Sequence, residues 1–118
     1  MVEVVGSRDT GNSPKNKLVE EIAVTLESGA FLTETFPSDM TLEAPNGQRI
    51  EGEGPITQHI AATTKPVKIE VQHAISHGKV GAASGISHLP DGSKKRFCYV
   101  IDFTNTKANK VALVRSYV

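Results

Sequence analysis

The second half of the chain has the pattern of four strands in succession, and this pattern constrains the fold more than any other feature. Apolar and polar residues alternate over residues 67–76, 80–88, 95–103 and 111–118. Such alternation places one face of each strand on a core and the other face toward solvent. Short turn sequences separate the first three runs, and a longer polar connection precedes the last. We therefore predict four strands that pair in sequence as an antiparallel sheet.

The first half carries helical signals instead. Ser13 and Pro14 are typical of a helix start, and Gly29 is typical of a helix end. Between them, apolar residues recur every three or four positions, which predicts a stripe that packs on the sheet. The remaining charged residues of this helix are expected to face water, namely Lys15, Lys17, Glu20, Glu21 and Glu27.

Three more elements are expected before the long strands. Residues 30–36 could form a short second helix that Pro37 ends. Residues 40–44 and 48–53 resemble a short hairpin around a turn, and a third helix is expected from Gly54 to Ala61. Helices that precede sequential strands predict an α+β fold in which the helices cover one face of a curved antiparallel sheet. We expect one domain over residues 13–118, preceded by a flexible arm over residues 1–12.

Charge and composition exclude several functions. The 118 residues hold 13 Lys and Arg against 13 Asp and Glu, whereas a nucleic-acid-binding protein usually has a basic surplus. No apolar run approaches the roughly 20 residues needed to cross a bilayer, so we expect no membrane partner. Cys98 is the single cysteine, which rules out an internal disulfide and favours a reducing, cytoplasmic location.

No sequence motif indicates a cofactor. Neither a Walker loop, a dinucleotide-binding glycine pattern nor a nucleophile elbow occurs. His73 and His77 resemble a metal pair, but four residues of strand span roughly 13 Å, which is too far for two imidazoles to share an ion. We therefore expect neither a cofactor nor a metal.

His73 and Tyr99 are the candidate functional side chains. By strand period, His73 shares a face with Val71 and Ile75, which should meet the helices. It is either a core histidine with one hydrogen-bond partner or a pocket histidine that serves as donor, acceptor or base. Tyr99 shares the inner face with Phe97, and its hydroxyl either reaches a core partner or points into a cavity.

The opposite face of the sheet is also partly apolar. It is expected to carry Cys98, Val100, Val111 and Leu113, which is more apolar surface than a solvated face usually shows. We therefore expect a homodimer that forms through this outer face.

The order of elements resembles that of the nuclear transport factor 2-like superfamily, which includes SnoaL-like cyclases and ketosteroid isomerases. The runs RFCYVIDF at 96–103 and VALVRSYV at 111–118 are similar to the last hairpin of small bacterial members. The segments MTLEAP at 40–45 and RIEG at 49–52 are similar to the central part of the family. The resemblance covers about residues 14 to 118 and implies a cone-shaped barrel with a cavity between the helices and the concave face of the sheet.

The same resemblance argues against ketosteroid isomerase chemistry. Where those enzymes have a carboxylate base before the central proline, this chain has Ala44. Where they have an acid on the third long strand it has Tyr99, and where they have a tyrosine on the first helix it has Ile22. Without a base, enolisation of that type cannot proceed. The Asp-Arg-Asp set of epoxide hydrolases with this fold has no match either.

Three functions remain open. The chain could bind a small apolar molecule in the cavity, act as a SnoaL-like enzyme of isomerase, cyclase or dehydratase type with His73 or Tyr99 in proton transfer, or serve as a non-catalytic dimerisation or accessory module. The expected pocket wall is the following set: Met40, Leu42, Ala44, His73, Phe97, Tyr99, Ile101, Val114 and Ser116.

Overall fold

The protein is an α+β structure with seven strands and two helices among the residues that are described. The computed structural model describes residues 2–11, 13–29, 37, 40–105 and 110–117. The predicted helix over residues 30–36 lies outside them. The elements in chain order are β1 (Glu3–Val5), α1 (Pro14–Ser28), β2 (Thr41–Glu43), β3 (Arg49–Glu51), α2 (Glu53–Ala61), β4 (Lys68–His77), β5 (Val80–His88), β6 (Lys94–Phe103) and β7 (Val111–Tyr117).

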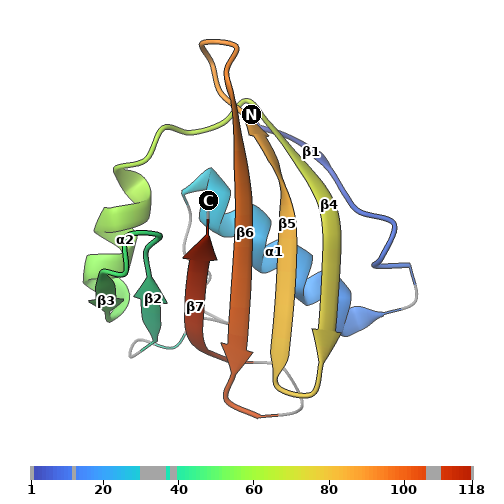
Figure 1. Cartoon of the computed structure of the whole chain (residues 1–118), viewed down its shortest axis with the longest axis vertical. Coiled ribbons are helices and arrows are strands. Elements are labelled where there is room, and N and C mark those ends of the chain that lie inside the picture. The colour runs from blue at the N-terminus through green and yellow to red at the C-terminus, as the bar shows by residue number, and fades with distance from the viewer. Residues whose placement is uncertain (1, 12, 30–36, 38–39, 106–109, 118) are drawn as a thin grey trace.

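All seven strands belong to one curved sheet, in the order β1-β4-β5-β6-β7-β2-β3. The long strands β4 to β7 pair antiparallel, as the sequence predicts. The sheet as a whole is mixed, because β1 pairs parallel with β4 and β2 pairs parallel with β7. These two contacts join segments far apart in the chain, so no hairpin signal could reveal their direction. Figure 1 shows α1 crossing behind the long strands and α2 beside the β2–β3 hairpin.

Helix α1 begins and ends at the predicted residues because both of its ends are capped. The Ser13 hydroxyl accepts a hydrogen bond from the Asn16 amide at 3.2 Å, and Pro14 follows it. At the other end Gly29 adopts a left-handed conformation with φ of 83°, which a residue with a side chain rarely adopts. Neither described helix is both long and apolar enough to cross a membrane.

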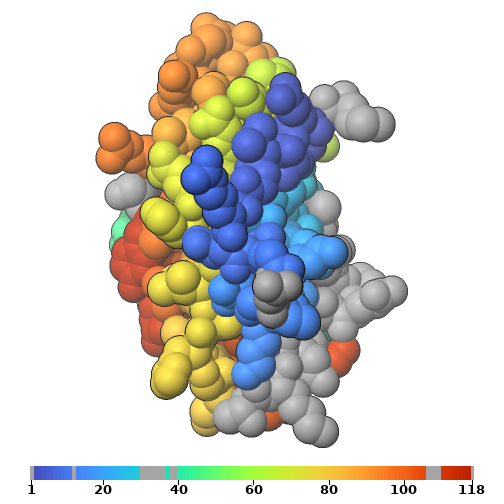
Figure 2. Space-filling model, turned by 90° about the vertical axis from the view of Figure 1, so that its right-hand side faces the viewer, coloured from blue at the N-terminus to red at the C-terminus, as the bar shows by residue number. Residues whose placement is uncertain are grey.

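The N-terminal segment, which we expected to be a flexible arm, contributes a strand to the sheet. Glu3 pairs with Lys68 and Val5 with Glu70, so β1 extends the edge beyond β4. Further along, the Asp9 carboxylate accepts a hydrogen bond from the Ala74 amide at 3.0 Å. Figure 2 shows this segment lying across β4 and α1. The composition of the segment suggested flexibility, but β4 offers an unpaired edge that its backbone can satisfy.

A bulge in β4 reverses which side chains face the core. The register shifts between Val71 and His73, so that one residue of β4 has no partner on β5. Val71 before the bulge is buried, whereas after it Ala74 is buried and Ile75 is 59% exposed. The expectation that Ile75 and His73 share the inner face of Val71 is therefore corrected, because an extra residue shifts the strand period by one.

Gly85 lies opposite this bulge, where two strands approach very closely. A Cβ atom at Gly85 would lie 2.0 Å from the Glu70 carbonyl oxygen and 2.6 Å from Cζ of Phe97. No side chain fits in that space. Bulges and glycines at such positions bend a sheet, and this bend helps to form the concave face on which α1 packs.

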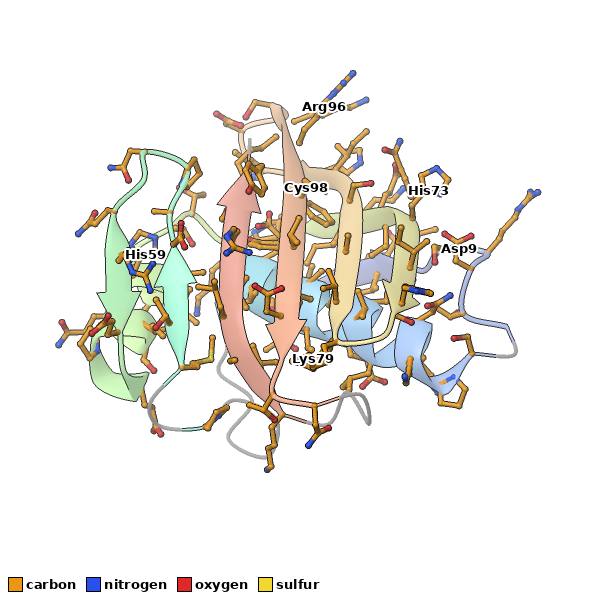
Figure 3. All side chains as sticks on the ribbon, turned by 60° about the horizontal axis from the view of Figure 1, so that its bottom comes forward. Asp9, His59, His73, Lys79, Arg96 and Cys98 are labelled. Carbon is orange, nitrogen blue, oxygen red and sulfur yellow. The ribbon has the colours of Figure 1, made fainter. Side chains whose placement is uncertain are left out.

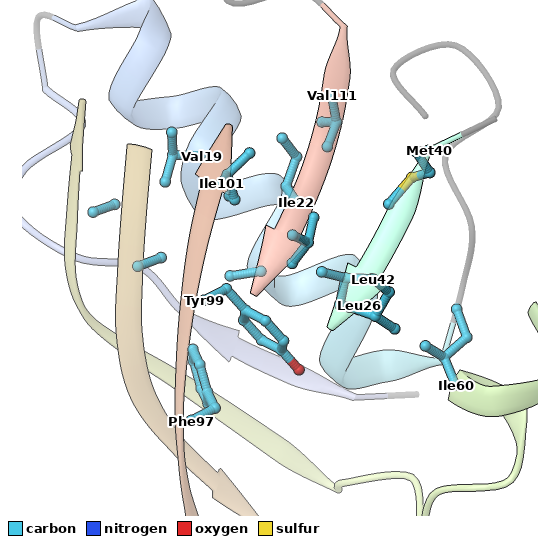
Figure 4. Packing of buried hydrophobic residues seen from close by; sticks show 14 of the residues in the cluster. Val19, Ile22, Leu26, Met40, Leu42, Ile60, Phe97, Tyr99, Ile101 and Val111 are labelled. Atoms are coloured by element: carbon cyan, nitrogen blue, oxygen red, sulfur yellow. The ribbon is translucent and has the colours of Figure 1, made fainter. Parts of the chain in front are cut away.

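The core lies between α1 and this concave face. Figure 4 shows Val19, Ile22 and Leu26 of the helix meeting Tyr99 and Ile101 of β6. Val111, which we expected on the outer face, is fully buried instead. A second register shift between Asp102 and Phe103 pairs Val111 with Phe103, so both point inward. Cys98, Val100 and Leu113 are half-buried, as expected for residues outside the core.

The substitution Gly85→Ala tests the close approach of β4 to β5 at this glycine. We expect it to lower the free energy of unfolding by about 3 kcal/mol, because the methyl group must displace the backbone of β4 or the Phe97 ring. Gly54→Ala in α2 is the matched control, since a Cβ there meets no atom within 4 Å. Urea unfolding followed by circular dichroism measures both variants. Equal stability of the two would contradict the packing described for Gly85.

Candidate functional site

A pocket opens where the C-terminal end of α1 meets β6, β7, β2 and the end of α2. Its volume is about 200 Å³. Its walls are mostly apolar, with Leu26, Leu42 and Ile60 lining it together with aromatic rings of β6. The polar atoms come from a few side chains, the most buried of which are Glu27 and Tyr99. An apolar hollow with few convergent polar groups is the usual form of a small-molecule site.

The structure brings five of the nine predicted pocket residues to this site. Leu42, Ala44, Phe97, Tyr99 and Ser116 line the pocket. The other apolar members of the predicted set lie in the core and do not line it. These core residues are Met40, Ile101 and Val114, each at most 1% exposed.

His73 lies on the opposite face of the sheet from the pocket. Its side chain is 76% exposed, and its Nδ1 atom lies 3.3 Å from the Asp9 carboxylate. Figure 3 shows the two residues at the end of the sheet away from His59, which lines the pocket. The β4 bulge turned His73 outward, so the structure does not bring His73 and Tyr99 together.

Glu27 is the residue that sequence reasoning missed. We expected it to face water, but it is 6% exposed and lies at the inner end of the pocket. A signal was present in the sequence, because Val19, Ala23 and Glu27 follow one another at four-residue spacing on the apolar stripe of α1. A carboxylate on a buried stripe is unusual enough to indicate a partner or a function.

Three donors compensate for the burial of the Glu27 carboxylate. The Ser87 hydroxyl donates to its Oε1 atom at 2.6 Å, and the Tyr99 hydroxyl donates to Oε2. The Lys95 ammonium lies 3.5 Å from Oε1. Burying an unpaired carboxylate is very unfavourable, and hydrogen bonds with an ion pair reduce that cost. Ser87 is itself 1% exposed, so this is a buried polar network.

Tyr99 stays a neutral hydroxyl over the whole physiological range. Burial raises its pKa because the ionised form would lose its hydration, and the negative charge of Glu27 raises the pKa further. The hydrogen bond to Glu27 acts in the same direction. Figure 4 shows the Tyr99 hydroxyl pointing toward the end of α1 that carries Leu26. Tyr99 is therefore held as a hydrogen-bond donor to the carboxylate.

Basic side chains surround the mouth of the pocket. His59 of α2 and both Lys95 and Arg96 of β6 line it. Residues 94–96 are exposed at the start of β6, and Lys95 also reaches the buried Glu27 carboxylate. Figure 3 shows Arg96 extending into solvent at the end of β6. Among the described residues, no group of three His, Cys, Asp or Glu side chains could hold a metal ion.

Comparisons with known proteins identify the fold. No family model matches the sequence, and no curated protein matches it. Among solved structures, an NTF2-like protein of unknown function from Burkholderia xenovorans LB400 matches with a TM-score of 0.69 at 18% identity, over 87% of this chain and 81% of that chain. The chain has the nuclear transport factor 2-like fold. An NTF2-like protein of unknown function from Mesorhizobium loti has a TM-score of 0.66 at 13% identity, over 97% of this chain and 98% of that one.

A designed protein shares the same architecture. A de novo designed protein with a curved β-sheet matches with a TM-score of 0.73 at 22% identity, over 92% of this chain and 88% of that chain. The resemblance noted in the sequence is thus confirmed at the level of fold. Likeness at such low identity carries no function, because one fold hosts many activities.

Tyr99→Phe tests the buried network through its pH dependence. At pH 7 we expect a loss of about 2 kcal/mol in the free energy of unfolding, since a hydrogen bond to a charged acceptor is removed. The pKa of Tyr99 is raised in the folded state, so its contribution is complete below the ordinary tyrosine pKa of about 10 and is lost as the pH rises above it. The difference between the wild type and the variant should therefore shrink above pH 10.

Urea unfolding at several pH values from neutral to strongly alkaline measures this difference. Tyr117→Phe is the control, because it removes a 50% exposed tyrosine from the same sheet. A Tyr99→Phe variant that loses stability in parallel with the wild type at high pH would contradict a buried, neutral Tyr99.

Proposed function

We propose that the protein binds a small, mainly apolar molecule in the pocket between α1, β6 and α2. The observation that carries this proposal is the combination of apolar walls with a buried polar end formed by Glu27 and Tyr99. Ligand sites usually combine such walls with a few fixed polar groups that orient the ligand. The pocket is smaller than the roughly 300–1,000 Å³ of sites for drug-sized molecules, which favours a small ligand.

A second candidate is an enzyme of the SnoaL-like type. The contact between a buried carboxylate and a tyrosine hydroxyl favours it, because proton transfer needs such a pair within hydrogen-bond distance of the substrate. His73 is on the other face of the sheet, so Glu27 takes its place beside Tyr99 in this candidate. An accessory role with a closed core is less well supported, since the pocket is open at its basic mouth.

Binding is tested by the effect of small apolar compounds on thermal stability. Benzyl alcohol and cyclohexylmethanol at ten times their dissociation constant should raise Tm by about 5 °C, because a ligand that binds only the folded state stabilises it. Ser116→Phe fills the pocket from β7 and should abolish the shift. Mass spectrometry of the recovered compound distinguishes binding from turnover.

Ala112→Phe is the matched control for the pocket-filling variant. It adds the same ring to β7 at an exposed position that does not line the pocket. It should keep the full response to both compounds. A shift that survives in Ser116→Phe, or the absence of any shift in the wild type, would count against this pocket as the binding site.

We also propose that a second copy of the chain covers the outer face of the sheet. Ile75 is 59% exposed there and Val80 is 45% exposed, near the half-buried Val100. Apolar residues gathered on one sheet face favour an interface. Sedimentation velocity should report a homodimer, and Val100→Glu should shift it to a monomer because a charge would be buried. A wild type that sediments as a monomer at high concentration would refute the proposal.

A further inference from the structure

We infer that the inner end of the pocket selects ligands that donate hydrogen bonds, an alcohol or a protonated amine, and rejects carboxylates. This inference rests on the proposed function, because it specifies the chemistry of the ligand for the same pocket. It follows from how the described side chains around Glu27 use their donors and acceptors.

The hydroxyl hydrogens at the inner end are already used. Ser87 and Tyr99 each have one hydroxyl hydrogen, and both donate it to Glu27. Thr63, at the pocket wall, donates its hydroxyl hydrogen to the Ile60 carbonyl at 2.7 Å. A ligand that needs a hydrogen from Ser87, Tyr99 or Thr63 would have to break one of these bonds.

Acceptors remain available at the same place. A carboxylate offers about four lone-pair sites, and three donors reach Glu27, namely Ser87, Tyr99 and Lys95. Tyr99 lines the pocket, and its hydroxyl oxygen can accept a hydrogen bond while it donates to Glu27. The hydroxyl of Ser116, across from Tyr99 on β7, can turn to donate or accept. The inner end is therefore rich in acceptors.

Lys95 is the contact that a ligand cation can replace. Its ammonium lies 3.5 Å from Glu27 and its side chain is 44% exposed, whereas the Glu27 side chain is 4% exposed. A long, half-exposed ion pair is weak, so a ligand ammonium can take the place of the lysine. A ligand ammonium would then pair with a buried carboxylate, where electrostatic attraction is stronger than at the surface.

The basic mouth does not reverse this preference. Arg96 is exposed and extends into solvent at the end of β6, so salt screens its attraction for anions. A carboxylate that entered as far as Tyr99 would face the Glu27 carboxylate, and like charges at an interface give strong discrimination. The preferred group at the inner end is therefore a hydrogen-bond donor.

Three compounds with the same ring test the inference. Benzylamine, benzyl alcohol and benzoate differ mainly in the polar group, and isothermal titration at pH 7 gives their dissociation constants. Binding that Ser116→Phe abolishes is counted as binding in the pocket. We expect benzylamine and benzyl alcohol to bind at least about tenfold more tightly than benzoate.

Two variants locate the origin of the preference. Glu27→Gln removes the charge and adds an amide donor, so benzylamine should lose at least about tenfold in affinity while benzoate gains. Glu21→Gln, exposed on the same helix, is its control. Lys95→Met keeps the carboxylate and removes the competing ammonium, so benzylamine should bind more tightly and benzyl alcohol should not change. This second variant alters a half-exposed side chain and keeps the test valid if Glu27→Gln does not fold.

The outcomes separate the two proposals. Benzoate that binds in the pocket as tightly as benzylamine would overturn the inference and leave the proposed function standing. An unchanged preference in Lys95→Met and Glu27→Gln would also overturn it, because Glu27 would then not be its origin. If none of the three compounds binds, the proposed function fails and the inference fails with it.

Discussion

The close approach of β4 and β5 at Gly85 is the constraint on which the rest of this structure depends. Because Gly85 of β5 has no side chain, the Glu70 carbonyl of β4 can lie directly against it, next to the bulge in β4. Bulge and glycine together bend the sheet, and a bent sheet has a concave face that one helix can cover. The helix does not fill that face completely, and the space left at its C-terminal end is the pocket.

The same arrangement explains why a carboxylate is buried in so small a protein. Helix α1 crosses β4, β5 and β6, and its last turn brings Glu27 over Ser87 and Tyr99. An apolar side chain at this position could be buried without hydrogen-bond donors, because it carries no charge to compensate. A buried polar network that makes folding harder is expected where a protein has a ligand to recognise, and this is the physical basis for proposing a binding site at Glu27.

The parts of the site that sequence reasoning located lie on strands with regular alternation. Phe97 and Tyr99 face inward because β6 alternates without interruption from residue 97 to 101. His73 and Val111 were placed on the wrong faces because each lies next to a register shift, which changes the period of its strand by one residue. Glu27 was missed because charge was given more weight than its position on the apolar stripe, although the spacing from Val19 and Ala23 was visible.

The sequence by itself determined both described helices and the strands β2 to β7, together with their order. Capping residues, glycine turns and alternation depend on near neighbours, so they can be read along the chain. Only the tertiary structure decided the parallel contacts of β1 and β2, the bulge opposite Gly85 and the meeting of Glu27 with Tyr99. Each of these joins residues far apart in the sequence, and Glu27 and Tyr99 are 72 positions apart. The energy of these contacts depends on distance in space and on burial, and neither can be inferred from the residues that are neighbours in the sequence.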